Sequence, residues 1–185
     1  MASSIIGGLL ESGHPAQLIS AADPFPASLE RLRETAPIRV CADNPGAVAD
    51  ADVIIMAVKP QVMAEATDSI AAAVKANAAL VISIAAGVTM DAMAARLGAA
   101  AAIVRCMPNT PALLGCGASG LFANSKVSAQ QRQHAQSIMG AVGITCWVNS
   151  ERELDAITAL SGSGPAYFFL FMEAMIDAAC ELGLD

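Results

Sequence analysis

Aromatic and basic residues are scarce in this chain of 185 residues. Phe, Trp and Tyr make up 4% of it, and 10 Lys and Arg stand against 17 Asp and Glu, giving a net charge of -7. Binding to nucleic acid needs grouped Lys and Arg that neutralise phosphates. We therefore expect no nucleic-acid partner for this acidic chain, which has no basic cluster. The low aromatic content and abundant alanine predict helices that pack closely through small side chains.

Cysteine and histidine give little support for a disulfide framework or a metal site. The five cysteines are odd in number, and none are paired at C-x-x-C spacing. This pattern favours reduced thiols in a cytoplasmic protein. The two histidines, His14 and His134, lie far apart in the sequence. We therefore expect no metal centre.

Long uncharged hydrophobic runs are also missing, although 55% of the residues are hydrophobic. The most apolar stretch, 167–180, carries Glu173 and Asp177 and is shorter than the roughly 20 residues that span a membrane. No basic segment precedes an apolar run at the N-terminus, as it would in a signal peptide. We therefore expect a cytoplasmic protein without a membrane segment, and we interpret 167–180 as a buried helix.

Short β-branched runs alternate with helical patterns along the chain. Two of these runs are continuously apolar, as strands covered on both faces are. This alternation predicts an α/β fold, a Rossmann-like, doubly wound parallel sheet with helices on both faces. The expected strands are 18–20, 38–40, 52–58, 80–85, 101–106 and 144–148.

Helix start and stop signals fit between these strands. The candidates are Ser28 and Thr89 as N-caps, Pro60 at a first turn, Gly13 and Gly98 as terminators, and the capping boxes Ser128–Gln131 and Ser150–Glu153. After residue 149 the strand signal stops and only helical patterns follow. We therefore expect one domain over 1–149 and the start of a helical domain over 150–185.

The front of the chain differs from a complete Rossmann unit. Such a unit begins with a strand and a glycine-rich turn before its first helix. Here the chain opens with a helical stripe (Ile5, Ile6, Leu9 and Leu10) and only then reaches a short strand. We expect a sheet without its first strand, either because the chain is truncated at Met1 or because this sheet never has that strand.

Four segments carry the functional signal. "AVKPQ" (57–61), "SIAAGV" (83–88) and "VRCMPNTPALLGCG" (104–117) each follow an expected strand. In open α/β sheets, ligands bind in the crevice beyond the carboxyl ends of the strands. The fourth segment, "ALSGSGPAYFFLF" (159–171), runs glycines and serines directly into an apolar helix.

In their order and spacing these segments resemble the pyrroline-5-carboxylate reductase family, and the resemblance runs over essentially the whole chain. It implies NAD(P)H-dependent reduction of 1-pyrroline-5-carboxylate, a small-molecule substrate, to L-proline. It also implies NADPH as cofactor, with NADH as the alternative, and an all-helical dimerisation domain that forms a homodimer or a higher homo-oligomer.

The resemblance also bears on both ends of the chain. Family members begin with an apolar strand and G-x-G-x-x-M, and Met1 resembles that internal methionine. They continue beyond the position of Asp185 into more helices and a loop similar to S-P-G-G-T-T. We therefore expect truncation at both ends, and weak or absent activity of the 185-residue chain by itself.

The resemblance implies two groups of binding residues and no certain catalytic residue. The cofactor group consists of Met1, Asn44, Ala57, Val58, Lys59, Pro60, Ala85, Ala86, Met107, Asn109 and Thr110. The substrate group consists of Ser161, Ser163, Gly164 and Pro165. At Ala22–Asp23, where such folds read the ribose, an acid suits a free 2′-OH and no Lys or Arg is present to meet a 2′-phosphate.

The glycines and Pro165 of the fourth segment predict an anion site. Glycine lets backbone N–H groups approach a ligand closely, and proline in a first turn leaves the other N–H groups of a helix N-terminus free. Such a terminus suits the carboxylate of a small imino acid. A protonated iminium is already electrophilic, so the site needs no strong base.

Other interpretations stay open at this point. The substrate segment can also be interpreted as a tight hinge between two domains, and both interpretations can hold at once. A dehydrogenase of the β-hydroxyacid type would need a lysine on the helix after Pro165, where the sequence has none up to Asp185. A remnant without catalysis, which only dimerises or binds nucleotide weakly, is the alternative from a different class.

Overall fold

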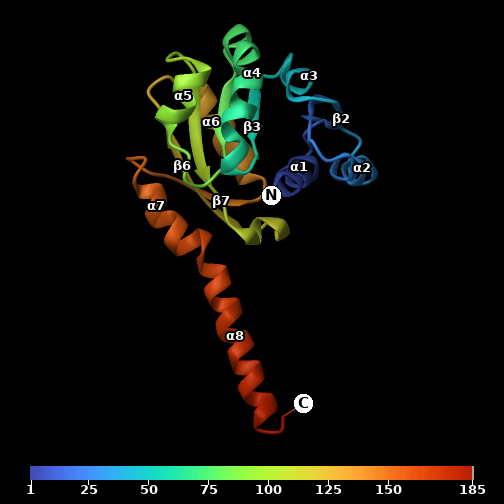
Figure 1. The fold of residues 1–185 in the computed structure, drawn as a ribbon, viewed down its shortest axis with the longest axis vertical. Helices are drawn as coiled ribbons and strands as arrows, with labels where there is room; N and C mark the ends of the chain where they lie inside the picture. Colours follow the sequence, from blue (N-terminus) through green and yellow to red (C-terminus); the bar gives the residue numbers. More distant parts are fainter. Residues whose placement is uncertain (185) are drawn as a thin grey trace.

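An α/β body carries a long helical arm in the computed structural model, which describes residues 1–184 (Figure 1). The arm is α8 (Gly164–Glu181), which extends away from the body and ends near the C-terminus (Figure 1). Asp185, the last residue of the expected helical domain, lies outside the described residues.

The central sheet has five strands in the order β3-β4-β5-β6-β7. The parallel part consists of β3 (Val53–Met56), β4 (Leu80–Ser83) and β5 (Ala102–Met107). Beside it, β6 (Gly117–Ala123) runs antiparallel to β5, and β7 (Gly143–Trp147) runs parallel to β6. The sheet is therefore mixed, with most of its pairings parallel.

The sequence did not predict β6. Its first half, "GASG", has no β-branched or aromatic residue, so it lacks the local preference for a strand. The strand is stabilised by tertiary pairing instead, because β6 exchanges hydrogen bonds with β5 on one side and β7 on the other.

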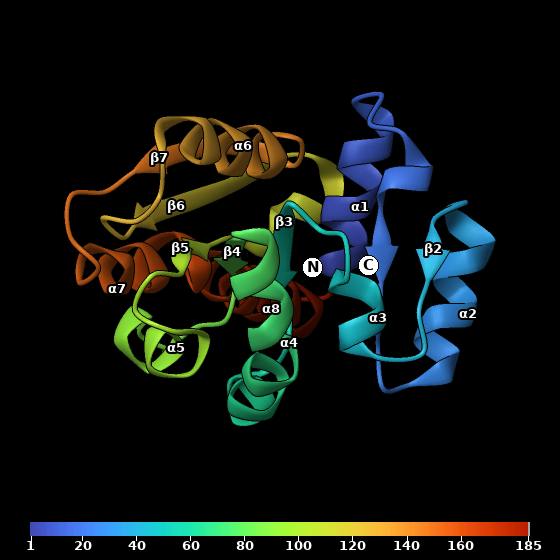
Figure 2. The same ribbon diagram turned by 90° about the horizontal axis from the view of Figure 1, so that it is seen from above.

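A second, separate sheet consists of β1 (Ser20–Ala21) and β2 (Arg39–Val40), which pair in parallel. Among the described strands, β1 and β3 are not joined by hydrogen bonds. Figure 2 shows the β1–β2 pair beside β3, on the side of the body that also carries α1 and α2. The break falls where a Rossmann sheet has its first strand, as the sequence predicted.

Helices cover both faces of the central sheet (Figure 2). On one face, α3, α4 and α5 pack on alternate residues of the strands, including Ile54, Val81 and Ile103. On the other face, α1 and α6 pack on the intervening residues, including Leu80, Ile82 and Val104. The helices are α1 (Ala2–Glu11), α2 (Pro26–Thr35), α3 (Asn44–Val48), α4 (Met63–Asn77), α5 (Met90–Leu97), α6 (Ala129–Gly140) and α7 (Glu153–Ile157).

Most of the predicted helix ends are confirmed. Thr89 accepts a hydrogen bond from the Ala92 N–H, and Ser128 forms a complete capping box with Gln131. Gly13 has a φ of +86°, and its N–H bonds to the Leu10 carbonyl as the chain leaves α1. Pro60 opens a 3₁₀ turn (Pro60–Val62) that leads into α4.

Two of the predicted caps are wrong. Ser28 lies inside α2, whose N-cap is Phe25. The hydroxyl of Ser150 donates to the Glu153 carboxylate, and α7 begins only at Glu153, so these residues form no capping box. α2 instead begins at Pro26, a residue favoured in a first turn, and the N-cap of α7 is Arg152.

The interpretation of 167–180 as a buried helix is also wrong for this chain. Large apolar side chains of α8 are exposed, with Phe168 at 71% and Ile176 at 63% of full accessibility. The apolar composition indicates side chains that need to pack against another surface, but no element of the described chain packs against them. The exposed group comprises Tyr167, Phe168, Phe169, Leu170, Phe171, Met172, Met175 and Ile176.

Gly143→Ala is expected to destabilise the fold. Gly143 has a φ of +145°, and a Cβ at this position would clash with the backbone of Gly117 on β6. Strain and overpacking together predict a loss of about 2–4 kcal/mol in the free energy of unfolding, measured by denaturant titration. Gly140→Ala is the control, because a Cβ there would meet nothing within 4 Å. Equal stability of the two variants would contradict the prediction.

Cys106 is expected to resist alkylation in the folded protein. Burial raises the pKa of its thiol to about 12, and a hydrogen bond with Ser119 lowers it by a smaller amount. Since the thiolate is the reactive form, iodoacetamide near about pH 8 should modify the exposed Cys116 and Cys146 and spare Cys106. Peptide mapping by mass spectrometry measures the labelling, and a denatured sample is the control.

The same thiol makes stability depend on pH at high pH. Between its ordinary pKa of 9.0 and about 12, the unfolded thiol loses its proton while the folded one keeps it. The unfolded state therefore binds fewer protons, and this group's contribution to stability falls as the pH rises through that window.

Candidate functional site

The candidate site lies at the carboxyl edge of the parallel strands. The registers pair Met56 with Ser83, and Ser83 with Arg105, so β3, β4 and β5 end at the same edge. The predicted segments 57–61, 83–88 and 104–117 leave the sheet at this edge, where β3, β4 and β5 end at Met56, Ser83 and Met107. The topology thus brings together residues that are up to about fifty positions apart in sequence.

Small residues and one cation line the β3 and β4 side of this edge. Ala57 and Ala86 are exposed, and Ala85 is buried at 7% accessibility. Lys59 is exposed and directly precedes the 3₁₀ turn. Pro60 opens that turn and sets the direction of the chain into α4. Small side chains leave room for a flat ligand, and an exposed lysine suits an anionic one. These residues fit a nicotinamide dinucleotide.

On β5, the segment from Met107 to Thr110 is joined to the start of the arm. The Asn109 amide donates to the Ser161 carbonyl (3.3 Å) and hydroxyl (3.1 Å) oxygens. The Asn109 side-chain oxygen accepts from the Ala118 N–H of β6 at 2.9 Å. The predicted cofactor residue Asn109 and the predicted substrate residue Ser161 are therefore in direct contact.

Ser161 lies in a π-helical turn, Thr158–Gly162, which we call the π turn. It continues α7 and is followed by α8, so the three form a nearly continuous helical segment. A Cβ on Gly162 would lie 2.6 Å from the Met107 Cε atom, so glycine permits this close approach. Turns of this type are frequent at functional sites.

The predicted open helix N-terminus is contradicted at two of its N–H groups, those of Ser163 and Ala166. The Ser163 N–H donates to the Thr158 carbonyl at 2.8 Å, and the Ala166 N–H donates to the Ser163 carbonyl. These N–H groups satisfy the chain's own carbonyls because the π turn runs directly into α8. Any contact of Ser163 with a ligand would therefore use its side chain, which makes no capping bond to α8 within the described structure.

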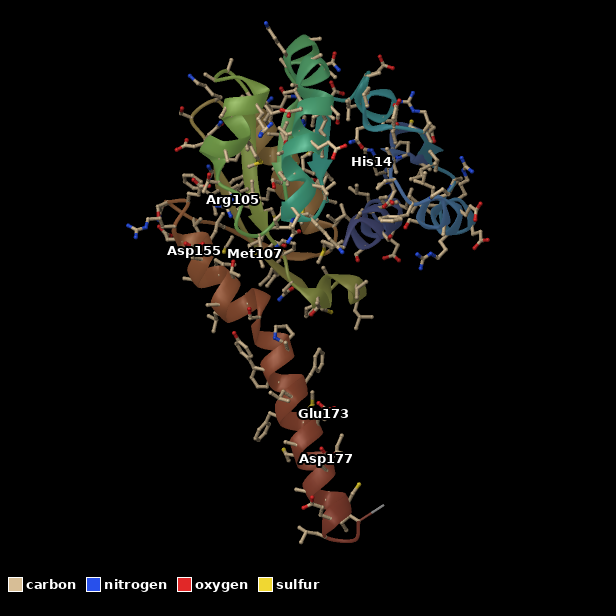
Figure 3. The ribbon with its side chains drawn as sticks, in the orientation of Figure 1. His14, Arg105, Met107, Asp155, Glu173 and Asp177 are labelled. Carbon is tan, nitrogen blue, oxygen red and sulfur yellow. The ribbon has the colours of Figure 1, made fainter. Side chains whose placement is uncertain are left out.

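An ion pair that the sequence did not predict anchors the segment before α7. Arg105, 8% accessible on β5, donates to the Glu151 carboxylate at 2.7 Å. The same carboxylate oxygen accepts from the Met90 N–H at the start of α5. Figure 3 shows Arg105 and Met107 near the end of the sheet where α7, with Asp155, joins the body. An arginine inside an otherwise apolar strand was the available signal.

The remaining predicted residues lie apart from this cluster. Asn44 begins α3, and its amide donates to the Ser69 hydroxyl of α4 at 3.1 Å. Met1 is the N-cap of α1, and α1 contacts the 3₁₀ turn Thr110–Leu114 that follows Asn109. Asp23 accepts from the Phe25 N–H at 2.8 Å, which engages its carboxylate in the turn before α2.

Within residues 1–184, no group of three or more His, Cys, Asp or Glu side chains is arranged to hold a metal ion. Across the same described part of the chain, no helix combines the length and apolar character that crossing a membrane requires.

Two family models match the chain. Residues 1–87 match the family described as NADP oxidoreductase, coenzyme F420-dependent. Residues 151–185 match the family described as pyrroline-5-carboxylate reductase dimerisation. The second match covers α7, the π turn and α8, the segment that carries the exposed apolar side chains.

Solved structures share the fold. A pyrroline-5-carboxylate reductase from Coxiella burnetii aligns with a TM-score of 0.92 and 41% identity over 100% of this chain and 68% of its own. The Plasmodium falciparum enzyme, solved with NADP bound, aligns with a TM-score of 0.87 and 27% identity over 99% of this chain and 66% of its own.

Curated relatives show the family. The pyrroline-5-carboxylate reductase of Pseudomonas aeruginosa is 50% identical over all of this chain, which spans 67% of that relative's length. The enzyme of Pasteurella multocida is 47% identical and is spanned to 68%. The chain therefore belongs to the pyrroline-5-carboxylate reductase family.

Proposed function

We propose that the protein carrying this chain reduces 1-pyrroline-5-carboxylate to L-proline with a reduced nicotinamide cofactor. The observation that carries the proposal is the contact between the carboxyl edge of the sheet and the π turn. Asn109 and Ser161 meet there through hydrogen bonds of 3.1 and 3.3 Å, so the proposed cofactor and substrate residues adjoin. Family membership supplies the substrate, because relatives up to 50% identical are named for this reaction.

The cofactor is proposed to lie along the carboxyl edge. Lys59 meets its phosphates, and the neighbouring small residues let it approach the backbone. Met107, Asn109 and Thr110 border its nicotinamide end, while Met1 and Asn44 lie toward its phosphate and ribose parts. The proposed contacts at the ends of β3 and β4 are Ala57, Val58, Pro60, Ala85 and Ala86.

NADPH is the proposed cofactor, and NADH is the alternative. The family model over residues 1–87 is described as an NADP oxidoreductase, and the Plasmodium falciparum neighbour has NADP bound. In this chain, Ala22–Asp23 offers no cation for a 2′-phosphate, and the Asp23 carboxylate is engaged with the Phe25 N–H. Comparison of the two cofactors therefore belongs in the first assay.

The proposed substrate site comprises Ser161, Ser163, Gly164 and Pro165. When bound, the reduced cofactor supplies the hydride that adds to the carbon of the C=N bond. The chain's own residues bind the imino acid and hold it against the nicotinamide face, which is where most of the acceleration would arise. A protonated iminium is electrophilic without assistance, so a general base is not needed for the addition.

The chain is proposed to have two parts and to assemble with itself. A dinucleotide-binding domain covers 1–149, and 150–185 forms the start of a helical dimerisation domain. The exposed apolar side chains of α8, such as Phe169 and Phe171, need cover that another subunit would provide. A homodimer or higher homo-oligomer fits the match of residues 151–185 to a dimerisation family.

Turnover of 1-pyrroline-5-carboxylate tests the function. With the purified protein that carries this chain, we expect imine-dependent oxidation of NADPH, followed by absorbance, with proline as the product. Substitution of NADH should lower kcat/KM if NADPH is the cofactor. Turnover of a 3-hydroxy acid instead would favour a dehydrogenase of the β-hydroxyacid type. Binding of nucleotide without any turnover would favour a non-catalytic protein.

Lys59→Ala is expected to weaken cofactor binding. Loss of one charge-assisted hydrogen bond to phosphate predicts a rise of about 10–100-fold in the dissociation constant of NADPH, measured by fluorescence titration at fixed salt. Lys75→Ala is the matched control. It removes the same charge from the last turn of α4, whereas Lys59 precedes the 3₁₀ turn that leads into the start of that helix. Equal weakening in both variants would show a general effect of charge and contradict a direct contact.

A further inference from the structure

Asn109 has its side-chain polar groups committed to the protein itself. Its oxygen accepts from the Ala118 N–H at 2.9 Å, and its NH₂ group donates to two oxygens of Ser161. An amide NH₂ group has two donors, so the bonds to Ser161 account for both of them. The donors of this amide are therefore committed to Ser161, and only one acceptor position of its oxygen is left for a ligand.

The two partners of Asn109 are themselves connected. The Ser161 hydroxyl donates to the Ala118 carbonyl at 3.4 Å, so Asn109 and Ser161 bind opposite polar groups of the same β6 residue. The network is half-buried, and Met107 packs against Gly162 beside it. The π turn is therefore fixed to the ends of β5 and β6 at one place, by polar bonds and a close apolar contact together.

We propose that Asn109 is a positioning residue for the imino-acid substrate, which acts through Ser161 by holding the π turn against β5 and β6. This proposal rests on the proposed function, because it places the substrate at residues 161–165. It assigns the Asn109 side chain to the substrate side of the site, whereas the family resemblance assigns the residue to the cofactor. The two assignments predict different kinetic effects.

Asn124 provides a matched control at the other end of the same pair of strands. Its oxygen accepts from the Ile103 N–H, and its NH₂ group donates to the Ala101 carbonyl. It is half-buried like Asn109 and bridges β5 to the end of β6. Asn124→Ala therefore removes a similar set of bonds at a distance from the π turn.

The test compares Asn109→Ala, Asn109→Asp and Asn124→Ala in the protein that carries this chain. Asn109→Asp keeps the acceptor for Ala118 and loses the donors to Ser161, so it separates the two bonds. We expect both Asn109 variants to raise KM for 1-pyrroline-5-carboxylate by about 10–100-fold, as misplacement of a substrate-positioning group does. The dissociation constant of NADPH should stay within about twofold of the unchanged protein.

Three kinetic results would overturn the proposal. Weakening of NADPH binding as large as the change in KM would make Asn109 a direct cofactor ligand. Equal kinetic effects of Asn124→Ala would leave Asn109 with a purely structural role. Full additivity of Asn109→Ala with Ser161→Ala would also count against it, because residues that act through one bond are not additive.

Hydrogen exchange of the amides at 158–166 gives a readout that does not depend on activity. Exchange should be faster in Asn109→Ala than in Asn124→Ala, since only the first variant releases the π turn. Equal exchange in the two variants would overturn the positioning role. If the unchanged protein does not turn over the imine, the proposed function fails, and exchange still decides whether Asn109 holds the π turn.

Discussion

The hydrogen bonds among Asn109, Ala118 and Ser161 join the helical arm to the sheet, and the geometry of the candidate site depends on them. They act where β5 ends and β6 begins, so they fix the π turn relative to the carboxyl edge. The ion pair of Arg105 and Glu151 supports the same junction at the segment before α7. Buried Leu154 of α7 adds apolar packing at the same junction.

The carboxyl edge itself follows from parallel pairing. Because β3, β4 and β5 run in the same direction, the chain leaves all three at one side, and residues such as Lys59 and Met107 share that side. The antiparallel β6 starts at this edge and runs back along β5. Its second residue, Ala118, donates its backbone N–H to Asn109. The mixed sheet thus supplies both the open edge and the support for the arm.

Local signals in the sequence predicted much of the fold. The apolar runs at 80–85 and 101–106 became buried strands, and Ser128 with Gln131 formed the expected capping box. Other features depended on distant partners. The glycine-rich β6 is a strand because two neighbouring strands pair with it. The Ser163 N–H is hydrogen-bonded to the Thr158 carbonyl because the π turn continues into α8. The site residues at the strand ends were predicted from the family resemblance. The parallel order of β3, β4 and β5 places them at one edge of the sheet.

By itself, the sequence determined the alternation of strands and helices and the apolar character of α8, because composition and short-range spacing carry this information, and its motifs indicated the family by resemblance. The tertiary structure decided which residues touch. Asn109 meets Ser161 across 52 positions, and Arg105 meets Glu151 across 46, and no local pattern specifies either pair. Such contacts arise only when the sheet order brings separate segments together, so the support of the site is a property of the fold.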